Sequence, residues 1–298
     1  MIISAVAFSK KLQTSTNAFV TSLGVADLLT SITLIWNIVG SLGTEWLIPE
    51  ANWICQFTNF MIYACIGTSV WTLSMIGINR LIHILKPIWY KKIFTSWKLV
   101  ILVLIPWVIP EAGLIIVLAT GNVAYEFDKE SFACTENNKT FVYDLLLNTV
   151  FLLPLLAIVG SYICIYVYVK NTFGNRNKVR GLQSQNRTIL PTVIADCRRK
   201  QISKQEIVIT KNLFIVVVGF FVCFVPYFTI LALPNSNTIL HIRYYATLGP
   251  YANSAINFII YAIKHPDFKV VPRHMMRCSY ADIPQPSPIL KYLLSRRN

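Results

Sequence analysis

The fold is decided by the stretch Ser74-Met75-Ile76-Gly77-Ile78-Asn79-Arg80-Leu81-Ile82-His83-Ile84-Leu85-Lys86-Pro87, which closes an apolar run that begins at Asn52. An apolar helix of ~20 residues crosses the hydrocarbon core of a bilayer, so this run can span a membrane. An arginine is costly in hydrocarbon, so Arg80 is expected at the membrane edge or facing a protein interior. Two interpretations follow: Arg80 anchors the helix end, or it is a switch that grips a carboxylate in one state and releases it in another.

The composition is that of an integral membrane protein. Of the 298 residues, 55% are hydrophobic and 13% are charged, and the mean hydropathy is +0.55. A soluble domain usually carries about 25% charged residues. The net charge of +14 could indicate nucleic-acid binding. The basic residues instead punctuate apolar runs and form no soluble basic face, so no nucleic-acid partner is expected.

Long continuous apolar runs predict six membrane-spanning helices. They cover residues 16–40, 52–85, 97–119, 141–169, 206–233 and 242–263. The runs do not alternate, which argues against a β-barrel. A further apolar stub, residues 1–8, is too short to span and precedes Lys10 and Lys11. We expect it to be the inner end of a helix whose beginning is missing, so that the full protein has seven spans.

Loop charges give the orientation, because loops rich in Lys and Arg stay in the cytoplasm. The basic set includes residues 10–11, 86–98 and 171–205, whereas the other loops are acidic. Arg80 and the carboxyl terminus therefore lie inside. We divide the chain into a transmembrane domain, residues 1–278, with its third cytoplasmic loop at 171–205, and a cytoplasmic tail, residues 279–298. Basic and apolar residues alternate just after residue 264, which predicts a short amphipathic helix on the inner leaflet.

Cysteines and a sequon mark the two faces. Cys55 and Cys134 are the two cysteines assigned to the oxidising outer side, so we expect a disulfide between them. Asn138 begins an Asn-Lys-Thr sequon in the same outer loop, where glycosylation is expected. Cys278 follows basic residues near the inner face, where either palmitoylation or a free thiol fits.

Polar residues inside the spans are functional-site candidates. Asp27 lies in the middle of the first full span, and Ser69, Asn253 and Asn257 lie at similar depth. The two asparagines are four apart and share one helix face. This set would coordinate a small cation through hard oxygen ligands or form a water-filled polar network, and the sequence leaves both open. Glu206 lies at the same face as Arg80, so the two either pair or remain separate interfacial charges.

Taken in order, these features resemble the rhodopsin family (class A) of G-protein-coupled receptors. The motifs that carry the resemblance are Asp27, Cys55, Ser69, Asn79-Arg80-Leu81, Trp107, Pro154, Tyr162, Cys223-Phe224-Val225-Pro226 and Asn257-Phe258-Ile259-Ile260-Tyr261. The resemblance implies an all-α membrane protein: a seven-transmembrane helix bundle with most of the first helix missing, plus the short amphipathic helix. It also implies a plasma-membrane receptor that binds an extracellular ligand and activates heterotrimeric G proteins.

The resemblance assigns roles to single residues. Arg80 matches the arginine that meets the G protein, and Glu206 matches its inactive-state partner on the sixth helix of the family. Tyr162 and Tyr261 match tyrosines that help hold the active form. A sodium-binding cluster of the family is matched by Asp27, Ser69, Asn253 and Asn257. A packing triad that relays ligand contact inward is matched by Val70, Pro154 and Phe220.

The chain also departs from the family pattern. Asn79 replaces an acid, so Arg80 is expected to depend more on Glu206. Tyr251 stands where opsins carry the retinal lysine, and Ile62 where aminergic receptors carry an aspartate, which disfavours retinal and simple amines. The Asn-Arg pair and the missing seventh-helix proline are similar to melatonin-type receptors. The predicted ligand pocket is mostly apolar and aromatic, and is lined by Ile62, Tyr63, Ile66, Glu111, Asn148, Phe224, Tyr227 and Tyr251.

Other classes of protein fit the sequence less well. A transporter or channel tends to show internal repeats, and none is convincing here. An enzyme is not expected, because the sequence has no His-Glu-x-x-His pair, nucleophile elbow or phosphate loop. A non-signalling receptor fragment is a further alternative. Sodium as an allosteric ion is the one bound ion that the residues suggest, and the expected partners are a G protein, an extracellular ligand and membrane lipids.

Overall fold

Long helices make up most of the fold, which a computed structural model describes for residues 1–42, 52–128, 133–137, 140–185, 204–231, 233, 242, 245–246, 248–264 and 266–296. The helices are α1 (Ile2–Phe8), α2 (Ser15–Leu42), α3 (Asn52–Leu85), α4 (Pro87–Ile93), α5 (Ser96–Ala119), α6 (Phe141–Gln185), α8 (Lys204–Leu231), α10 (Leu248–Lys264), α11 (Pro266–Met276) and α12 (Pro288–Ser295). Short 3-10 turns, η1 (Lys10–Leu12) and η2 (Tyr280–Asp282), and one hairpin, β1 (Ala124–Asp128) and β2 (Ala133–Asn137), complete the described part.

Five of the six predicted spans are confirmed as long apolar helices. Within the described ranges, five helices are long and apolar enough to cross a membrane, and they are α2, α3, α5, α6 and α8. The sixth predicted span corresponds to α10, which is described over 17 residues. The chain is therefore a multi-pass helical membrane protein.

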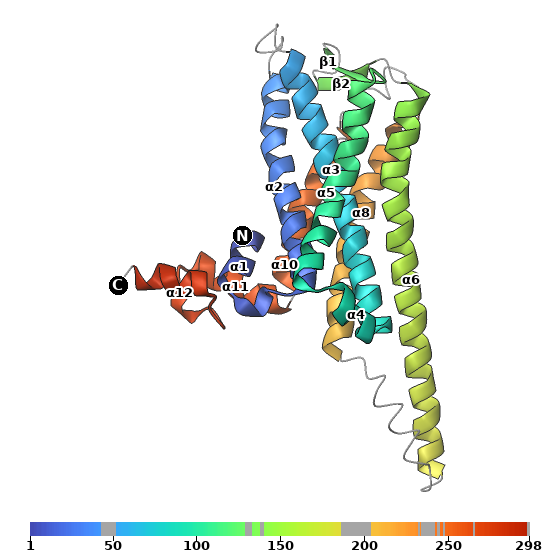
Figure 1. The fold of residues 1–298 in the computed structure, drawn as a ribbon, viewed down its shortest axis with the longest axis vertical. Coiled ribbons are helices and arrows are strands. Elements are labelled where there is room, and N and C mark those ends of the chain that lie inside the picture. Colours follow the sequence, from blue (N-terminus) through green and yellow to red (C-terminus); the bar gives the residue numbers. More distant parts are fainter. Residues whose placement is uncertain are drawn as a thin grey trace.

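The helix α3 lies at the centre of the bundle (Figure 1), with α2, α5 and α6 packed against it and α8 packed on α10. In its most apolar stretch 78% of the residues are buried, against 22 to 44% in the other four spans. The outer spans direct apolar side chains away from the bundle, as lipid-facing helices do. The central position of α3 explains why its polar residues, Arg80 among them, are enclosed by neighbouring helices.

Four segments differ from the prediction. The helix α6 continues to Gln185, well into the predicted third cytoplasmic loop, because an established helix gains one hydrogen bond for each added residue and its sequence after Pro154 contains no further proline. A short helix, α4, begins at Pro87 in an expected inner loop. The outer loop holds the β1–β2 hairpin. The predicted tail contains η2 and α12, which pack beside α1 and α11 (Figure 1).

Candidate functional site

A buried polar contact joins α2 to α10 in the middle of the bundle. Asp27 on α2 is 8% exposed, and the side-chain amide of Asn257 donates to its two carboxylate oxygens at 3.4 and 3.2 Å. Ser254, also on α10, lies within interaction range of the same carboxylate. A buried carboxylate without donors would be costly, so these bonds fix α2 against α10.

The other two members of the predicted polar cluster, Ser69 and Asn253, are also buried. Ser69 donates its hydroxyl to the carbonyl oxygen of Cys65 at 2.9 Å, within α3. Asn253 lies one turn before Asn257 on α10, and the side-chain oxygens of both asparagines are buried with no hydrogen-bond partner among the described residues. Buried acceptors are normally satisfied, so these oxygens mark a place for an ion or water.

The donor set fits a small hard cation. One carboxylate, one hydroxyl and two amide oxygens are the ligand types that such ions prefer. The part of the chain that the structure describes has no cluster of three or more His, Cys, Asp and Glu side chains that would suit a softer metal. Whether the unpartnered amide oxygens bind sodium or a water network stays a prediction.

Arg80 and Asn79 lie buried near the carboxyl-terminal end of α3, which is predicted to face the cytoplasm. Arg80 is 6% exposed and Asn79 is fully buried. The hydroxyl of Thr16, at the start of α2, donates to the side-chain oxygen of Asn79 at 2.8 Å. Asn79 therefore binds a neighbouring helix, and Thr16 is a site residue that the sequence analysis missed. A polar residue at the start of a span was the available signal.

The predicted partners of Arg80 come from α6, α8 and α10. Tyr162 on α6 is 9% exposed and lies within electrostatic range of the Arg80 guanidinium. Glu206 lies in the first turn of α8 and Tyr261 lies in α10. The side chains of Glu206 and Tyr261 fall outside the described residues, so their pairing with Arg80 stays a prediction.

A row of aromatic rings runs along α8. Phe220, Phe224 and Phe228 are four residues apart, which places them on one helix face. Phe220 stacks on Phe224 with ring centroids 4.1 Å apart, and Phe224 stacks on Phe228 at 6.1 Å. Phe151 of α6 meets Phe228 edge to face at 5.6 Å. Offset and edge contacts of this kind stabilise aromatic clusters, so the row connects the outer part of α8 to the packing triad.

The packing triad is buried, and a tryptophan next to it secures α6. Val70, Pro154 and Phe220 are all buried. Proline has no N–H, so Pro154 leaves the carbonyl of Val150 without its helical donor. The indole N–H of Trp71 donates to that carbonyl at 2.9 Å. Trp71 was not predicted as a site residue, although the proline four residues after Val150 was the signal.

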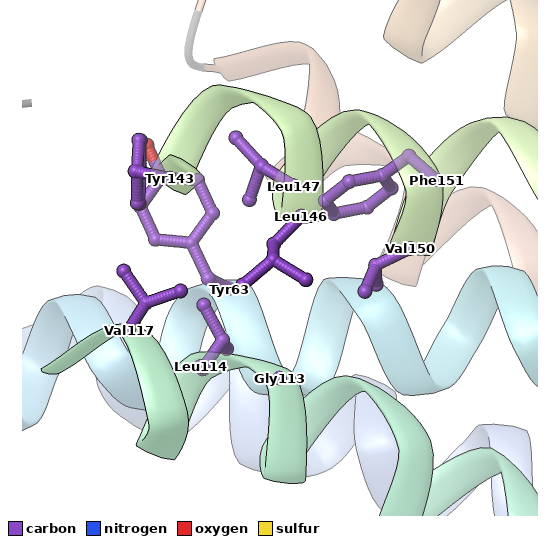
Figure 2. A pocket seen from close by; sticks show the side chains of 9 residues that line it. All are labelled: Tyr63, Gly113, Leu114, Val117, Tyr143, Leu146, Leu147, Val150 and Phe151. Carbon is purple, nitrogen blue, oxygen red and sulfur yellow. The ribbon is translucent and has the colours of Figure 1, made fainter. Parts of the chain in front are cut away.

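A shallow pocket lies between α3, α5 and α6 (Figure 2). The space that it encloses is small, about 10 Å³, and is partly open to the surroundings. Figure 2 shows Tyr143 and Phe151 of α6 and Leu114 and Val117 of α5 around it. The lining residues are Tyr63, Gly113, Leu114, Val117, Tyr143, Leu146, Leu147, Val150 and Phe151. The pocket is apolar and aromatic and shares only Tyr63 with the predicted ligand lining, so the predicted ligand site stays a prediction.

The remaining predicted ligand residues lie in different places. Tyr227 on α8 and Tyr251 on α10 lie within electrostatic range of each other, whereas Asn148 is exposed on α6. Glu111 on α5 is half-buried and within range of the Cys65 thiol. The apolar members, Ile62, Ile66 and Phe224, are buried in the main core. The structure thus places the two tyrosines within electrostatic range and does not gather the whole set around one pocket.

The outer hairpin packs against this end of the bundle. Tyr125 of β1 is fully buried and stacks on Tyr63 at 6.1 Å. Cys55 is buried and disulfide-bonded. Cys134 lies in β2, which packs against α3, but its side chain falls outside the described residues, so the Cys55–Cys134 pairing stays a prediction. Asn138 also falls outside them. Cys278 is exposed just after α11.

Comparison with known proteins decides the family. Residues 1–261 match the family described as 7 transmembrane receptor (rhodopsin family). The chain belongs to this family. Squid rhodopsin shares the fold, with a TM-score of 0.75 at 18% identity over 95% of this chain and 76% of that one. The resemblance read from the motifs is confirmed, and a transporter or channel is not favoured.

Several receptors with stated ligands are similar in sequence. Melatonin receptor type 1B-A of Danio rerio is 30% identical over 57% of this chain, and the Dopamine D2-like receptor of Drosophila melanogaster is 30% identical over 54%. The matched parts span 58% and 18% of those two proteins. The Allatostatin-A receptor of Bombyx mori is 25% identical over 93% of this chain and 75% of its own length. These relatives differ in ligand, so they leave the ligand of this rhodopsin-family chain open.

Proposed function

We propose that this rhodopsin-family chain is a plasma-membrane receptor that binds an extracellular ligand and activates heterotrimeric G proteins by helix movement around Arg80. The burial of Arg80 carries the proposal, because it is 6% exposed at the inner end of the most buried span. An ionisable group kept inside a membrane protein is costly and is usually retained for function. An anchoring arginine would instead reach the headgroups.

The switch works as a shift between two helix packings. In the resting packing, Glu206 at the start of α8 holds Arg80. Movement of α8 about Pro226 separates them, and Arg80 turns to the G protein while Tyr162 and Tyr261 stabilise the new arrangement. The buried Tyr162 beside Arg80 and the aromatic row on α8 support this route.

The finer architecture belongs to the same proposal. α1 contributes the inner part of one helix in a seven-helix bundle, α11 lies along the inner leaflet, and the carboxyl terminus is cytoplasmic. Cys55 and Cys134 form the outer disulfide, Asn138 carries a glycan and Cys278 is palmitoylated. The buried state of Cys55 and the packing of β2 on α3 support the disulfide.

A sodium ion is proposed as an allosteric ligand of the resting packing. Asp27, Ser69, Asn253 and Asn257 would hold it, and the ion would supply the positive charge that the buried carboxylate and amide oxygens lack. The contact between Asp27 and Asn257 already joins α2 to α10, so occupancy would favour the packing in which these helices are close.

The ligand is proposed to be weakly polar and aromatic. The tyrosine pair Tyr227 and Tyr251 and the stacked pair Tyr63 and Tyr125 offer ring faces and few charges. Melatonin, dopamine and an allatostatin-A peptide are suitable probes, because receptors named for them are similar to this chain. An amine such as dopamine is disfavoured by Ile62.

The test is GDP–GTP exchange on purified heterotrimeric G proteins, in membranes that carry the chain at matched surface expression. Exchange above that of empty membranes, with or without a probe, is expected for the wild-type chain and absent for Arg80→Ala. The substitution Lys98→Ala, at a half-buried lysine on α5, is a control and should leave exchange intact. Exchange that persists in Arg80→Ala would refute the switch.

A further inference from the structure

The carboxyl-terminal segment docks on the amino-terminal segment. Ser9 and Pro286, far apart in sequence, form an antiparallel bridge. The N–H of Ser287 donates to the carbonyl of Phe8 at 2.8 Å, and the N–H of Lys10 donates to the carbonyl of Gln285 at 2.9 Å. Two backbone hydrogen bonds in opposite directions fix the register, so the tail is held in one place beside α1.

Side chains close this docking site. The hydroxyl of Ser9 donates to the carbonyl of Pro284 at 2.9 Å, and the hydroxyl of Ser287 accepts from the N–H of Leu290, which caps α12. Ile283 and Leu290 are each 2% exposed. Buried apolar side chains and satisfied polar groups are what a folded contact needs, so α12 starts from a rigid base.

The helix α12 has a second apolar face that the other described residues leave exposed. Leu290 and Leu294 face the base, whereas Ile289, Tyr292 and Leu293 are 55, 57 and 48% exposed. These three residues are spaced by three and four, so they form one contiguous stripe, here called the outer stripe of α12. A solvated tail would not concentrate large apolar side chains on its exposed side.

Charge identifies what the outer stripe meets. From residue 264 to the end, the chain carries seven Lys or Arg and two Asp. The Arg296 guanidinium lies 5.2 Å from the ring centre of Tyr292, at the end of the stripe. Basic groups beside an apolar stripe match the headgroups and acyl boundary of an anionic leaflet.

The position of α12 fits the same surface. Ile2 of α1 reaches Gly24 of α2, so α1 runs along the inner half of a membrane span. The base of α12 is attached at Phe8 and Ser9, close to the inner end of that span. Figure 1 shows α12 beside α1 and α11, extending sideways from the bundle.

We propose that the outer stripe of α12, formed by Ile289, Tyr292 and Leu293 with Arg296 at its end, binds the anionic inner leaflet while its base stays docked on Phe8 and Ser9. The tail thereby becomes a second surface helix after α11, clamped to the amino-terminal segment. This role is independent of G-protein activation.

The experiment places an environment-sensitive fluorescent amino acid at position 293, in the outer stripe, or at position 295, on the polar side of α12. The full chain is reconstituted at one copy per nanodisc, with or without phosphatidylserine, and a lipid-borne nitroxide is the quencher. In phosphatidylserine discs, quenching at 293 is expected to exceed quenching at 295 by about three-fold. The difference should shrink without the anionic lipid.

Two further measurements test whether the outer stripe binds lipid or a second copy, and whether α12 stays docked on Phe8 and Ser9 while it does so. Equal quenching at positions 293 and 295 would overturn the membrane assignment. So would protection of position 293 from the quencher that occurs only in discs with two copies, because the outer stripe would then bind a second copy of the chain. A Ser9→Cys, Pro286→Cys disulfide locks the bridge. The difference should survive in the locked chain, and its loss would show that the helix reaches lipid only when undocked.

Discussion

Thr16 and Asn79 are joined by a buried hydrogen bond of 2.8 Å that ties the inner end of α2 to α3 next to Arg80. The sequence predicts that the change from an acid to Asn79 leaves Arg80 more dependent on Glu206. The structure adds that the side-chain oxygen of Asn79 is taken by Thr16. Asn79, the residue next to Arg80, therefore links α2 to α3 through its side chain.

Replacing Thr16 tests this link between α2 and α3. Thr16→Val keeps the shape and removes the donor, which leaves the buried oxygen of Asn79 unsatisfied. We expect a loss of about 1–2 kcal/mol in stability, measured as a lower thermal midpoint in detergent, while Thr16→Ser stays near wild type. Equal midpoints for the Val and Ser variants would contradict the bond.

The contact between Trp71 and Val150 can be tested by a double-mutant cycle. Trp71→Phe removes the indole donor from a carbonyl that Pro154 has deprived of its helical partner, so we expect it to cost about 1 kcal/mol or more. In a Pro154→Ala background the alanine N–H can satisfy Val150, and the cost of Trp71→Phe should fall. Thermal denaturation of the four proteins gives the coupling.

The exposed Trp53 supplies the control for this cycle, since Trp53→Phe should change little. An equal cost of Trp71→Phe in both backgrounds would mean that the indole stabilises the fold by packing alone.

The close approach of α10 to α8 depends on Gly249. A Cβ at this position would overlap the carbonyl oxygen of Cys223, a backbone atom that cannot move alone. Gly249→Ala should therefore lower the thermal midpoint and separate the two helices. Gly160→Ala is the control, because a Cβ there has nothing within 4 Å, and it should be neutral or stabilising by up to about 1 kcal/mol. Similar effects of the two substitutions would argue against the close contact.

Sodium dependence tests the cluster at Asp27. Raising NaCl against a choline chloride reference of equal ionic strength should raise the thermal midpoint of the wild-type chain, because a ligand that binds only the folded state stabilises it by mass action. Asp27→Asn removes the charge that would hold the ion, and its midpoint should not respond to sodium. A sodium response of equal size in Asp27→Asn would place the ion elsewhere.

Much of the fold follows from the sequence because lipid makes apolar length a strong signal. The second span is predicted as residues 52–85 and observed as Asn52–Leu85. The run to Gln185 in α6 and the hairpin were missed, since polar helical extensions and short strands carry no comparable hydropathy signal. The docking of α12 was missed because it depends on contacts between the two ends of the chain.

The buried polar site could be predicted in part. Asp27 and Asn257 meet, because polar residues at equal depth in neighbouring spans have few other partners. The sequence does not predict the roles of Thr16 and Trp71, because each depends on a partner elsewhere in the chain. Thr16 donates to the side chain of Asn79, and Trp71 donates to a carbonyl that Pro154 leaves without its helical donor. The residues that line the ligand pocket are harder to predict, because the sequence does not tell which face of a lipid-exposed helix such as α6 turns inward. Asn148, predicted in the lining, is exposed on α6.

The most direct test of the account is basal nucleotide exchange by the chain with Glu206→Ala, alone and combined with Arg80→Ala. If Glu206 restrains Arg80 with about 1 kcal/mol, its removal shifts the equilibrium about five-fold, and basal GDP–GTP exchange on the heterotrimer should rise several-fold. Adding Arg80→Ala should abolish the gain. Basal exchange that is unchanged or lower in Glu206→Ala, or that stays raised in the double variant, would contradict a switch built on Arg80.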